Sequence, residues 1–383
     1  MECRVRYKAR DKKTQSWSFK MELNNNCDAF AAKYWHKIDN DHVQCDLCPR
    51  SCKLKNNQSG LCFGRACKDN QMVLTTYGKS SGFCIDPIEK KPLFHFQPGT
   101  PVLSFGTVGC NLTCKFCQNW NISKSKETTT LTEQAHPKII ADVANQLQCS
   151  SVAFTYNEPV IFMEYAIETA KECHKLGIKT VAVTAGYIAE KPREEFFQYI
   201  DAANVDLKSF NEDFYHKLTG AHLGTVLETL KYIKNKTNVW LEITTLLIPN
   251  YNDSTQEIDQ LTKWIRENLG EEVPLHFSAF HPAWKMMDSP PTPIATLQLA
   301  REIAKKNNLR YVYIGNVHDP EGSCTFCHQC GKAVINRNQY RIVTYNLDKS
   351  GCCQHCKTRC SGIFQQECGT WNAKCQPIRL SRE

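Results

Sequence analysis

Three cysteines stand close together in the run GCNLTCKFCQNW, at Cys110, Cys114 and Cys117. Their spacing is Cys-x3-Cys-x2-Cys, which brings three thiolates into one short segment. A [4Fe–4S] cluster ordinarily takes four thiolates, so three ligands with no fourth in the run can leave one iron open. An open iron on a reducible cluster is a site of reaction as well as a relay for electrons. The triad therefore predicts a reactive iron–sulfur centre.

A second set of cysteines lies upstream, in CDLCPRSCKLKNNQSGLC. Its members are Cys45, Cys48, Cys52 and Cys62, spaced Cys-x2-Cys-x3-Cys-x9-Cys. Four thiolates that include one Cys-x2-Cys pair can close a tetrahedral zinc site. They can equally hold a second iron–sulfur cluster, or remain free buried cysteines. The spacing alone leaves these alternatives open.

A third set lies in residues 319–383, which carry nine of the 22 cysteines. Two Cys-x2-Cys pairs occur here, Cys327/Cys330 and Cys353/Cys356, and the pattern resembles a zinc ribbon. A segment this short and polar needs a staple to fold, so we expect a structural zinc ion. Cys324, Cys327 and Cys330 also read Cys-x2-Cys-x2-Cys, which keeps an iron–sulfur site as an alternative.

The elements that must position the triad are predicted by the middle of the chain. Apolar runs that read as strands occur at 102–107, 152–156, 180–184, 202–207, 239–248 and 275–280. Amphipathic helical stretches separate them, and Gly177 and Gly270 stand where helix ends favour glycine. This alternation predicts a parallel sheet in an α/β fold, a partial (β/α)6 barrel of TIM type. Reactive groups in such barrels lie at the carboxyl ends of the strands, and Cys110 follows the first strand.

Composition bounds the class of protein. With 383 residues, 42% hydrophobic and 22% charged, the chain is typical of a globular protein of three regions: 1–97, 98–318 and 319–383. It has no apolar stretch long enough to span a bilayer, and its charged start lacks the apolar core of a secretory signal. Paired cysteines in a long chain favour metal binding in a reducing compartment, so we expect a cytoplasmic protein. The net charge of +8 falls when thiolates bind metals, so nucleic-acid binding is not predicted.

Beyond the triad, residues 45–318 resemble the radical S-adenosylmethionine (radical SAM) enzymes of AmmeMemoRadiSam systems, relatives of the pyruvate formate-lyase activating enzymes. The match is collinear, and one departure is Ala279, where the family often has an arginine. The segments that carry it are CDLCPRSC (45–52), DPIEKKPLFHFQPG (86–99), FGTVGCNLTCKFCQNWNIS (105–123), TYNEP (155–159), DLKSF (206–210), FYHKLTGA (214–221), TTLLIPNYND (244–253), FHPAWKM (280–286) and YIGNV (313–317).

This resemblance implies an enzyme in which the triad binds three irons and SAM binds the fourth. Reductive cleavage of SAM would then give methionine and a 5′-deoxyadenosyl radical that takes hydrogen from a substrate. The substrate is not written in the sequence, and the family's association with Memo-type and AMMECR-type partners leaves room for a protein. A reductant such as flavodoxin or ferredoxin is implied as well.

The resemblance also implies SAM contacts near the triad. Phe116 would lie beside the adenine or shield the cluster. Asn157 and Glu158 stand where other members place a motif that holds the methionine amino group. A carboxylate that accepts from an ammonium makes a strong hydrogen bond. Glu158 followed by Pro159 also fits the start of a helix, and both roles are compatible.

Further contacts are implied at later strand ends. Thr184 and Gly186 would leave room for ribose and methionine. Asp206 and Lys208 would contact SAM or pair with each other in the barrel mouth. Weaker candidates are Glu242 and Thr244, which point to one face of the fifth strand, and Asn250 in the loop beyond. The lone histidines His95 and His281 are expected to be structural.

Three other functions compete with this reading. A glycyl-radical activating enzyme needs a partner that carries the target glycine loop. A non-catalytic iron–sulfur or zinc protein, which would act in electron transfer or in interactions, would bind metal without cleaving SAM. The segments TYNEP and DLKSF resemble parts of a SAM site and argue against this function. The modest net charge of the chain gives little support to a third function, the modification of nucleic acids.

Overall fold

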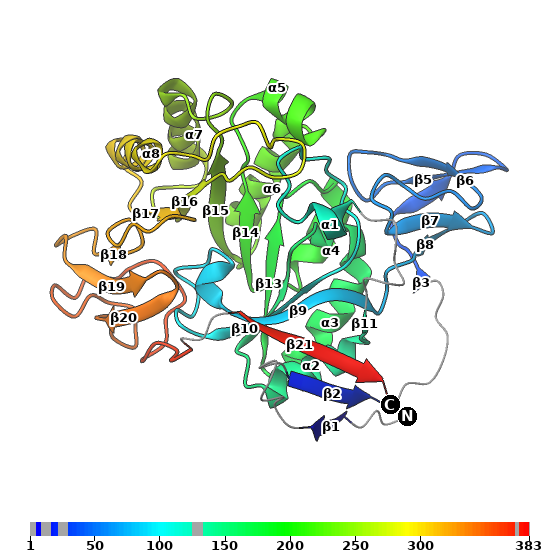
Figure 1. The fold of residues 1–383 in the computed structure, drawn as a ribbon, viewed down its shortest axis with the longest axis horizontal. Coiled ribbons are helices and arrows are strands. Elements are labelled where there is room, and N and C mark those ends of the chain that lie inside the picture. Colours follow the sequence, from blue (N-terminus) through cyan, green and yellow to red (C-terminus); the bar gives the residue numbers. More distant parts are fainter. Residues whose placement is uncertain (1–4, 9–16, 22–29, 125–132, 372–374, 383) are drawn as a thin grey trace.

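The structure is a computed structural model that describes residues 5–8, 17–21, 30–124, 133–371 and 375–382. Within these ranges, seven parallel strands neighbour one another in the order β10, β12, β13, β14, β15, β16, β17 (Figure 1). Their bounds are Pro101–Gly106, Ser151–Phe154, Lys179–Thr184, Ala202–Asp206, Trp240–Leu247, Leu275–Ala279 and Val312–Gly315. In the described chain the first and last of them do not pair, so the sheet forms an open, partial barrel.

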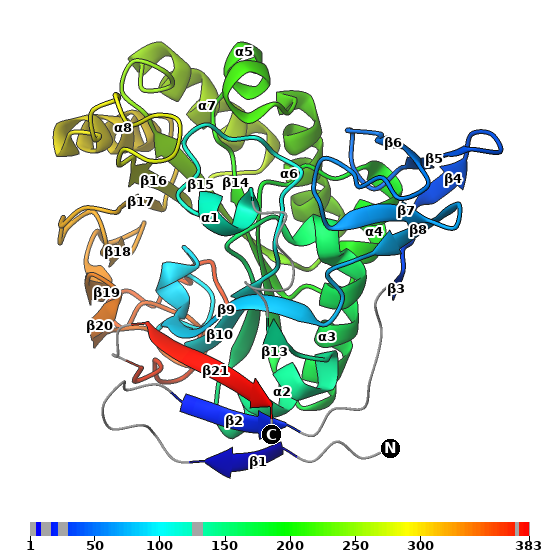
Figure 2. The same cartoon turned by 45° about the vertical axis from the view of Figure 1, so that its right-hand side comes forward.

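Helices connect these strands and cover the outside of the sheet (Figures 1 and 2). The longer ones are α2 (Pro137–Gln146), α3 (Met163–Lys175), α4 (Glu190–Phe197), α6 (Leu223–Lys236), α7 (Thr255–Asn268) and α8 (Ile294–Lys306). Short helical segments are η1 (Ile88–Lys90), α1 (Trp120–Ser123), η2 (Pro159–Phe162), α5 (Glu212–Phe214) and η3 (Tyr215–Thr219). Every residue of β12 and of β16 is buried, as expected for parallel strands covered on both faces.

The predicted alternation of strands and helices is confirmed. All six predicted strands form, and the structure adds a seventh, β17, at the short YIGNV segment. Gly177 and Gly270 follow α3 and α7 in left-handed conformations, with φ of +72° and +93°. Glycine adopts this conformation without steric cost, which explains why the two helices end there.

The two ends of the chain extend the sheet beyond β10. β9 (Lys79–Pro87) runs antiparallel to β10 and also pairs with β11 (Glu133–Gln134). Next come β21 (Gln376–Arg382), β2 (Trp17–Met21) and β1 (Val5–Lys8), so that segments from both termini lie side by side (Figure 2). Nothing in the spacing of residues predicts this pairing, because it joins segments more than 350 residues apart.

The cysteine set upstream of the triad, Cys45, Cys48, Cys52 and Cys62, lies in a small module of two three-stranded sheets. One contains β3 (Phe30–Ala31), β8 (Gln71–Leu74) and β7 (Arg65–Lys68); the other contains β4 (Trp35–Lys37), β5 (His42–Cys45) and β6 (Lys53–Lys55). We call residues 30–74 the N-terminal module. It lies on the opposite side of the barrel from residues 325–345, which are coloured orange (Figure 1).

The C-terminal cysteines lie around a sheet of β18 (Thr325–Phe326), β19 (Ala333–Asn338) and β20 (Arg341–Tyr345), and we call this sheet with its cysteines the C-terminal module. None of the helices in the described ranges is both long and apolar enough to cross a membrane. The cytoplasmic location stays a prediction, as do the region boundaries at 97 and 318.

Candidate active site

A cavity of about 290 Å³ opens at the carboxyl ends of the barrel strands. Its volume is near the lower end of the range for small-molecule sites. Besides the weaker candidate Thr244, it brings together nine predicted residues: Cys110, Cys114, Phe116, Cys117, Asn157, Glu158, Thr184, Asp206 and Lys208. They come from the loops and strand ends that follow β10, β12, β13 and β14, where the barrel architecture directs reactive groups.

The loop that carries the triad is held in place by backbone contacts. Gly109 has a φ of +90°, and a Cβ there would lie 1.9 Å from the carbonyl oxygen of Cys62. Only glycine fits so close an approach. Farther along, the backbone N–H of Thr113 donates to the carbonyl of Thr219 at 2.8 Å, and that of Lys115 donates to Leu218 at 2.9 Å. These contacts define the path of the loop that carries the triad.

Asn157 braces the same loop. Its Oδ1 accepts from the backbone N–H of Thr107 at 3.0 Å, and its Nδ2 donates to the carbonyl of Gly109 at 2.8 Å. A third bond joins Nδ2 to the Thr107 hydroxyl at 3.1 Å. The side chain lines the cavity, but its hydrogen bonds in the described structure hold the segment that leads into Cys110. The expected SAM contact stays a prediction, and a positioning role is added to it.

The three sulfurs of the triad are not gathered closely enough to share a single ion. In the described part of the chain, the one group of possible metal ligands that lie within 4.8 Å of one another is at the C-terminal end, so the triad is wider than this. A cluster spreads its thiolates over different irons, whereas one ion gathers them. Burial raises the pKa of Cys110 to about 12, so its thiol is neutral until a metal displaces the proton.

Glu158 presents a buried carboxylate to the cavity. Its Oε1 accepts from the Thr184 hydroxyl at 2.5 Å, and its Oε2 accepts from the backbone N–H of Ala185 at 2.7 Å. Oε1 also caps η2 through Val160 N at 3.3 Å, which confirms the predicted helix-start role. Burial raises its pKa to about 7. Among the described residues its hydrogen bonds are with neutral groups alone, which favours a cationic ligand at this point.

Lys208 and Asp206 form an ion pair at the next strand end. The Nζ of Lys208 lies 2.8 Å from Oδ2 of Asp206 and 6.0 Å from the ring centroid of Phe116. Burial opposes the charge on Lys208, but Asp206 outweighs it and raises the lysine pKa above its ordinary value. Phe116 is buried and packs against Phe214, with ring centroids 5.8 Å apart. The ion-pair alternative is therefore present, and both members still line the cavity.

Thr244 supplies a test of whether the site suits a ligand. Its hydroxyl is buried in the cavity wall and has no hydrogen-bond partner in the described structure. A buried polar atom without a partner is costly, and a bound polar molecule would satisfy it. Together with the three thiols and the Glu158 carboxylate, this hydroxyl fits a cluster and a polar, cationic cofactor.

Some lining residues were missed by the sequence reasoning, among them Tyr156, Ser278 and Asn316. The strand-end rule could have indicated Tyr156 and Ser278, because they lie at the carboxyl ends of β12 and β16. Gly186 behaves differently from its prediction: among the described residues it is not part of the cavity wall. It adopts a left-handed φ of +66° and its carbonyl accepts from the Thr229 hydroxyl at 2.8 Å.

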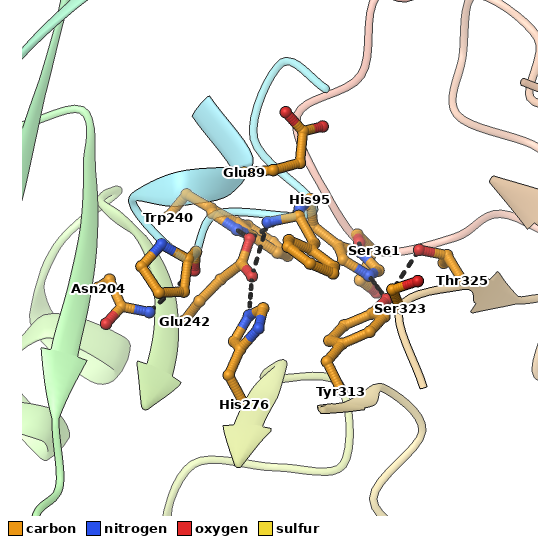
Figure 3. Close-up of polar contacts among 12 residues, drawn as sticks. Glu89, His95, Asn204, Trp240, Glu242, His276, Tyr313, Ser323, Thr325 and Ser361 are labelled. Atoms are coloured by element: carbon orange, nitrogen blue, oxygen red, sulfur yellow. Dashed lines mark hydrogen bonds and ion pairs between the residues drawn. The ribbon is translucent and has the colours of Figure 1, made fainter. Parts of the chain in front are cut away.

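Glu242 and His95 belong to a buried network (Figure 3), and neither lines the cavity, so the weaker candidate Glu242 has a structural role instead. The Glu242 carboxylate accepts from the backbone N–H of His95 at 2.7 Å and lies 2.7 Å from Nε2 of His276. The His95 ring lies 2.5 Å from the Tyr313 hydroxyl and 2.6 Å from the carbonyl of Ser361. Burial lowers the pKa of His95 to about 4, so the ring is neutral. This network fastens the C-terminal segment to the barrel, as a structural histidine would.

The C-terminal cysteines Cys327, Cys330, Cys353 and Cys356 converge on one point. The Sγ atoms of Cys327 and Cys356 are 3.5 Å apart, and those of Cys330 and Cys353 are 3.8 Å apart. Tetrahedral zinc with Zn–S bonds of about 2.3 Å requires sulfurs about 3.8 Å apart. The group thus fits zinc. Cys324 is not part of it, and its thiol donates to the carbonyl of Pro320.

Comparison with known proteins shows which family this chain is similar to. Residues 105–262 match the sequence model of the Radical SAM superfamily. An uncharacterized protein of Methanocaldococcus jannaschii, MJ0808, is 41% identical over 317 residues, which cover 83% of this chain and 94% of that protein. The pyruvate formate-lyase-activating enzyme of Clostridium pasteurianum is 29% identical over 163 residues, 41% of this chain and 66% of the enzyme.

Solved structures share parts of the fold more weakly. A domain of pyruvate-formate lyase-activating enzyme from Bacteroides vulgatus is 18% identical, with a TM-score of 0.39 over 43% of this chain and 99% of that domain. A radical SAM methyltransferase from Sphaerobacter thermophilus is 13% identical, with a TM-score of 0.46 over 75% of this chain and 76% of its own. Likenesses of this strength say nothing about activity.

Proposed function

The chain belongs to the radical SAM superfamily, and from that premise we propose that it is an enzyme that cleaves SAM reductively at a [4Fe–4S] cluster held by Cys110, Cys114 and Cys117. When bound, the reduced cluster and SAM would supply a 5′-deoxyadenosyl radical able to take hydrogen from a substrate. The observation that carries the proposal is the meeting, in one cavity, of three thiols, a buried carboxylate and an unpartnered hydroxyl.

The proposed roles of the side chains follow from their contacts. Glu158, held by the Thr184 hydroxyl and the Ala185 N–H, accepts hydrogen bonds from the methionine ammonium of SAM. The hydroxyl of Thr244 pairs with a polar atom of the same cofactor. Asn157 keeps the cysteine loop in register by its bonds to the backbone before Cys110.

The remaining lining residues shape and shield the site. Phe116 excludes water beside the triad, and the paired Asp206 and Lys208 present a polar wall to the ribose or the methionine carboxylate. Gly186 acts from behind the wall, where its left-handed backbone turns the chain away from the end of β13.

A glycyl-radical activating enzyme is the second candidate. It is favoured by relatives whose names describe activation of an enzyme, in Clostridium pasteurianum at 29% identity and in Escherichia coli at 25%. Under this candidate the substrate is a protein and the electron comes from a flavodoxin or ferredoxin. The resemblance to AmmeMemoRadiSam enzymes instead favours Memo-type and AMMECR-type proteins as partners.

The experiment is a SAM cleavage assay on anaerobically reconstituted protein reduced with dithionite. Chromatography is expected to detect 5′-deoxyadenosine and methionine from the wild type and none from Cys114→Ala. Cys149→Ala is the matched control, because Cys149 is equally buried but lies outside the described cavities. A wild-type protein that carries its cluster and yields no 5′-deoxyadenosine would overturn the proposal in favour of a non-catalytic metalloprotein.

A further inference from the structure

The four cysteines of the N-terminal module share one cavity. Cys45, Cys48, Cys52 and Cys62 all line it, and all are free thiols. Cys45 ends β5, the next two lie in the loop between β5 and β6, and Cys62 precedes β7. Three of them are buried and Cys52 is half-buried. Residues up to 17 positions apart in the sequence therefore line a single cavity.

The backbone of this module turns the cysteines inward. The N–H of Cys45 donates to the carbonyl of Cys52 at 3.0 Å, so the first loop is closed at its ends. Ser51 and Phe63, each next to one of the four cysteines, adopt left-handed φ values of +44° and +59°. Side chains other than glycine seldom adopt this conformation, and such residues concentrate at functional sites. The loops are thus shaped around the cavity at some cost in backbone energy.

The four sulfurs of the N-terminal set are not gathered as a single zinc ion requires. No three of these sulfurs lie within 4.8 Å of one another, since the described residues contain such a group only at Cys327, Cys330, Cys353 and Cys356. Tetrahedral zinc needs sulfurs about 3.8 Å apart, as the C-terminal group has. A four-iron cluster binds each thiolate through a different iron and so requires a wider set. In this respect the N-terminal set is like the triad.

Polar groups in the wall of this cavity lack partners. The Nη2 atom of Arg50 and the Oδ1 atom of Asn111 are both buried without a hydrogen-bond partner in the described structure, and both residues line the cavity. Arg65, fully buried and also in the wall, is paired with Glu164 at 2.5 Å. N–H donors around a cluster bond to its sulfurs and tune its potential. Arg50 and Arg65 thus place two cationic side chains in the wall that surrounds the four thiols.

This cavity lies directly against the triad. Asn111 belongs to its wall, whereas the chain neighbours Cys110 and Leu112 belong to the wall of the barrel-mouth cavity. The Nε of Arg50 donates to the Asn111 carbonyl at 2.9 Å, and Cys62 packs against the glycine before Cys110. One peptide segment separates the two sites.

We propose that Cys45, Cys48, Cys52 and Cys62 hold a second iron–sulfur cluster through which an external one-electron donor protein reduces the cluster of the triad. The donor loses one electron and the second cluster gains it; the electron then passes to the triad's cluster, and the second cluster returns to its oxidised state. No bond forms or breaks in the relay. The presence of the second cluster is independent of the proposed function, whereas its relay role rests on it.

The first test removes the triad and keeps the N-terminal module intact. The variant Cys110→Ala/Cys114→Ala/Cys117→Ala is reconstituted anaerobically as the full chain, and its iron, sulfide and zinc are counted. We expect about four irons per chain, held by protein ligands throughout, with an electron paramagnetic resonance signal that SAM does not change. Loss of all iron, or a second zinc ion in addition to that of the C-terminal module, would overturn the proposal.

The second test addresses the relay. The rate of SAM cleavage is measured with flavodoxin and with dithionite as reductant in Cys45→Ser/Cys52→Ser. The ratio of the flavodoxin rate to the dithionite rate should fall well below that of wild type, because the small reductant can reach the triad directly. Cys67→Ser is the control, since this buried cysteine of the same module does not line the cavity. An unchanged ratio would refute the relay.

The two tests also separate this proposal from the proposed function. If wild-type protein cleaves no SAM with either reductant, the proposed function fails, and the iron count of the triad variant still decides whether the second cluster exists. If the serine variant does not fold, the triad variant remains a valid measurement, because none of its substitutions lies in the N-terminal module.

Discussion

The carboxylate of Glu158 and the hydroxyl of Thr184 meet at 2.5 Å across the carboxyl ends of two neighbouring strands, β12 and β13. The bond fixes one oxygen of the carboxylate, and the N–H of Ala185 fixes the other. A buried acid held this way, with neutral donors only among its described hydrogen-bond partners, is prepared for a cation. Glu158 is therefore the residue on which the proposed SAM site depends most.

Replacement of Glu158 by Gln should weaken SAM binding without unfolding the protein. Glutamine keeps the shape and can still accept from Thr184, but it loses the charge that pairs with the ammonium. A hydrogen bond to a charged group contributes about 1.5–3 kcal/mol, so the Kd should rise roughly ten- to hundredfold. Isothermal titration of reconstituted protein measures this, with Glu168→Gln on the surface of α3 as control. Equal affinities of wild type and Glu158→Gln would rule out this role.

SAM binding should also depend on pH through Glu158. Burial raises its pKa from 4.5 to about 7, so in the free protein the acid is protonated below that value. The ammonium of SAM pairs with the ionised form, and affinity should therefore rise as the pH passes upward through about 7. The same acid contributes stability below pH 4.5 that is lost as the pH rises through about 7. Titrations one pH unit either side of this pKa test the prediction, and identical affinities would contradict it.

Replacement of Asn157 by Ala should impair assembly of the cluster. The substitution removes three hydrogen bonds to the segment before Cys110 and leaves the buried N–H of Thr107 without its partner. Leaving a buried group unsatisfied costs about 1–3 kcal/mol, which should loosen the loop. Iron per chain after reconstitution should fall, whereas Asn145→Ala, at an exposed position of α2, should retain wild-type iron. Full cluster content in Asn157→Ala would show that the brace is dispensable.

Removal of zinc should loosen the C-terminal module and leave the barrel folded. Cys353→Ser removes one ligand of the C-terminal group, so zinc content should fall by about one per chain and the melting temperature should drop. The network of His95 with Tyr313 and Ser361 ties this module to the barrel, which should keep its iron. Elemental analysis and calorimetry measure both effects. A wild-type module that contains iron and no zinc would contradict the assignment.

The sequence predicted the frame of the site better than its internal contacts. The triad follows β10 and Glu158 follows β12 as expected, because apolar periodicity identifies strands and parallel strands end at one edge. The bracing role of Asn157 and the position of Gly186 outside the cavity wall could not be predicted. They depend on contacts with Thr107 and Thr229 that no local pattern encodes. The same holds for β21, whose pairing with β2 unites segments from opposite ends of the chain.

The most direct test of the central claim is electron paramagnetic resonance of the reduced protein with and without SAM. It is best made on Cys45→Ser/Cys52→Ser, in which the cluster of the triad alone should give a signal. SAM bound to an open iron should shift the g-values and change the line shape, because its amino and carboxylate groups become ligands. A spectrum that SAM leaves unchanged, from protein with a full complement of cluster iron, would contradict the account.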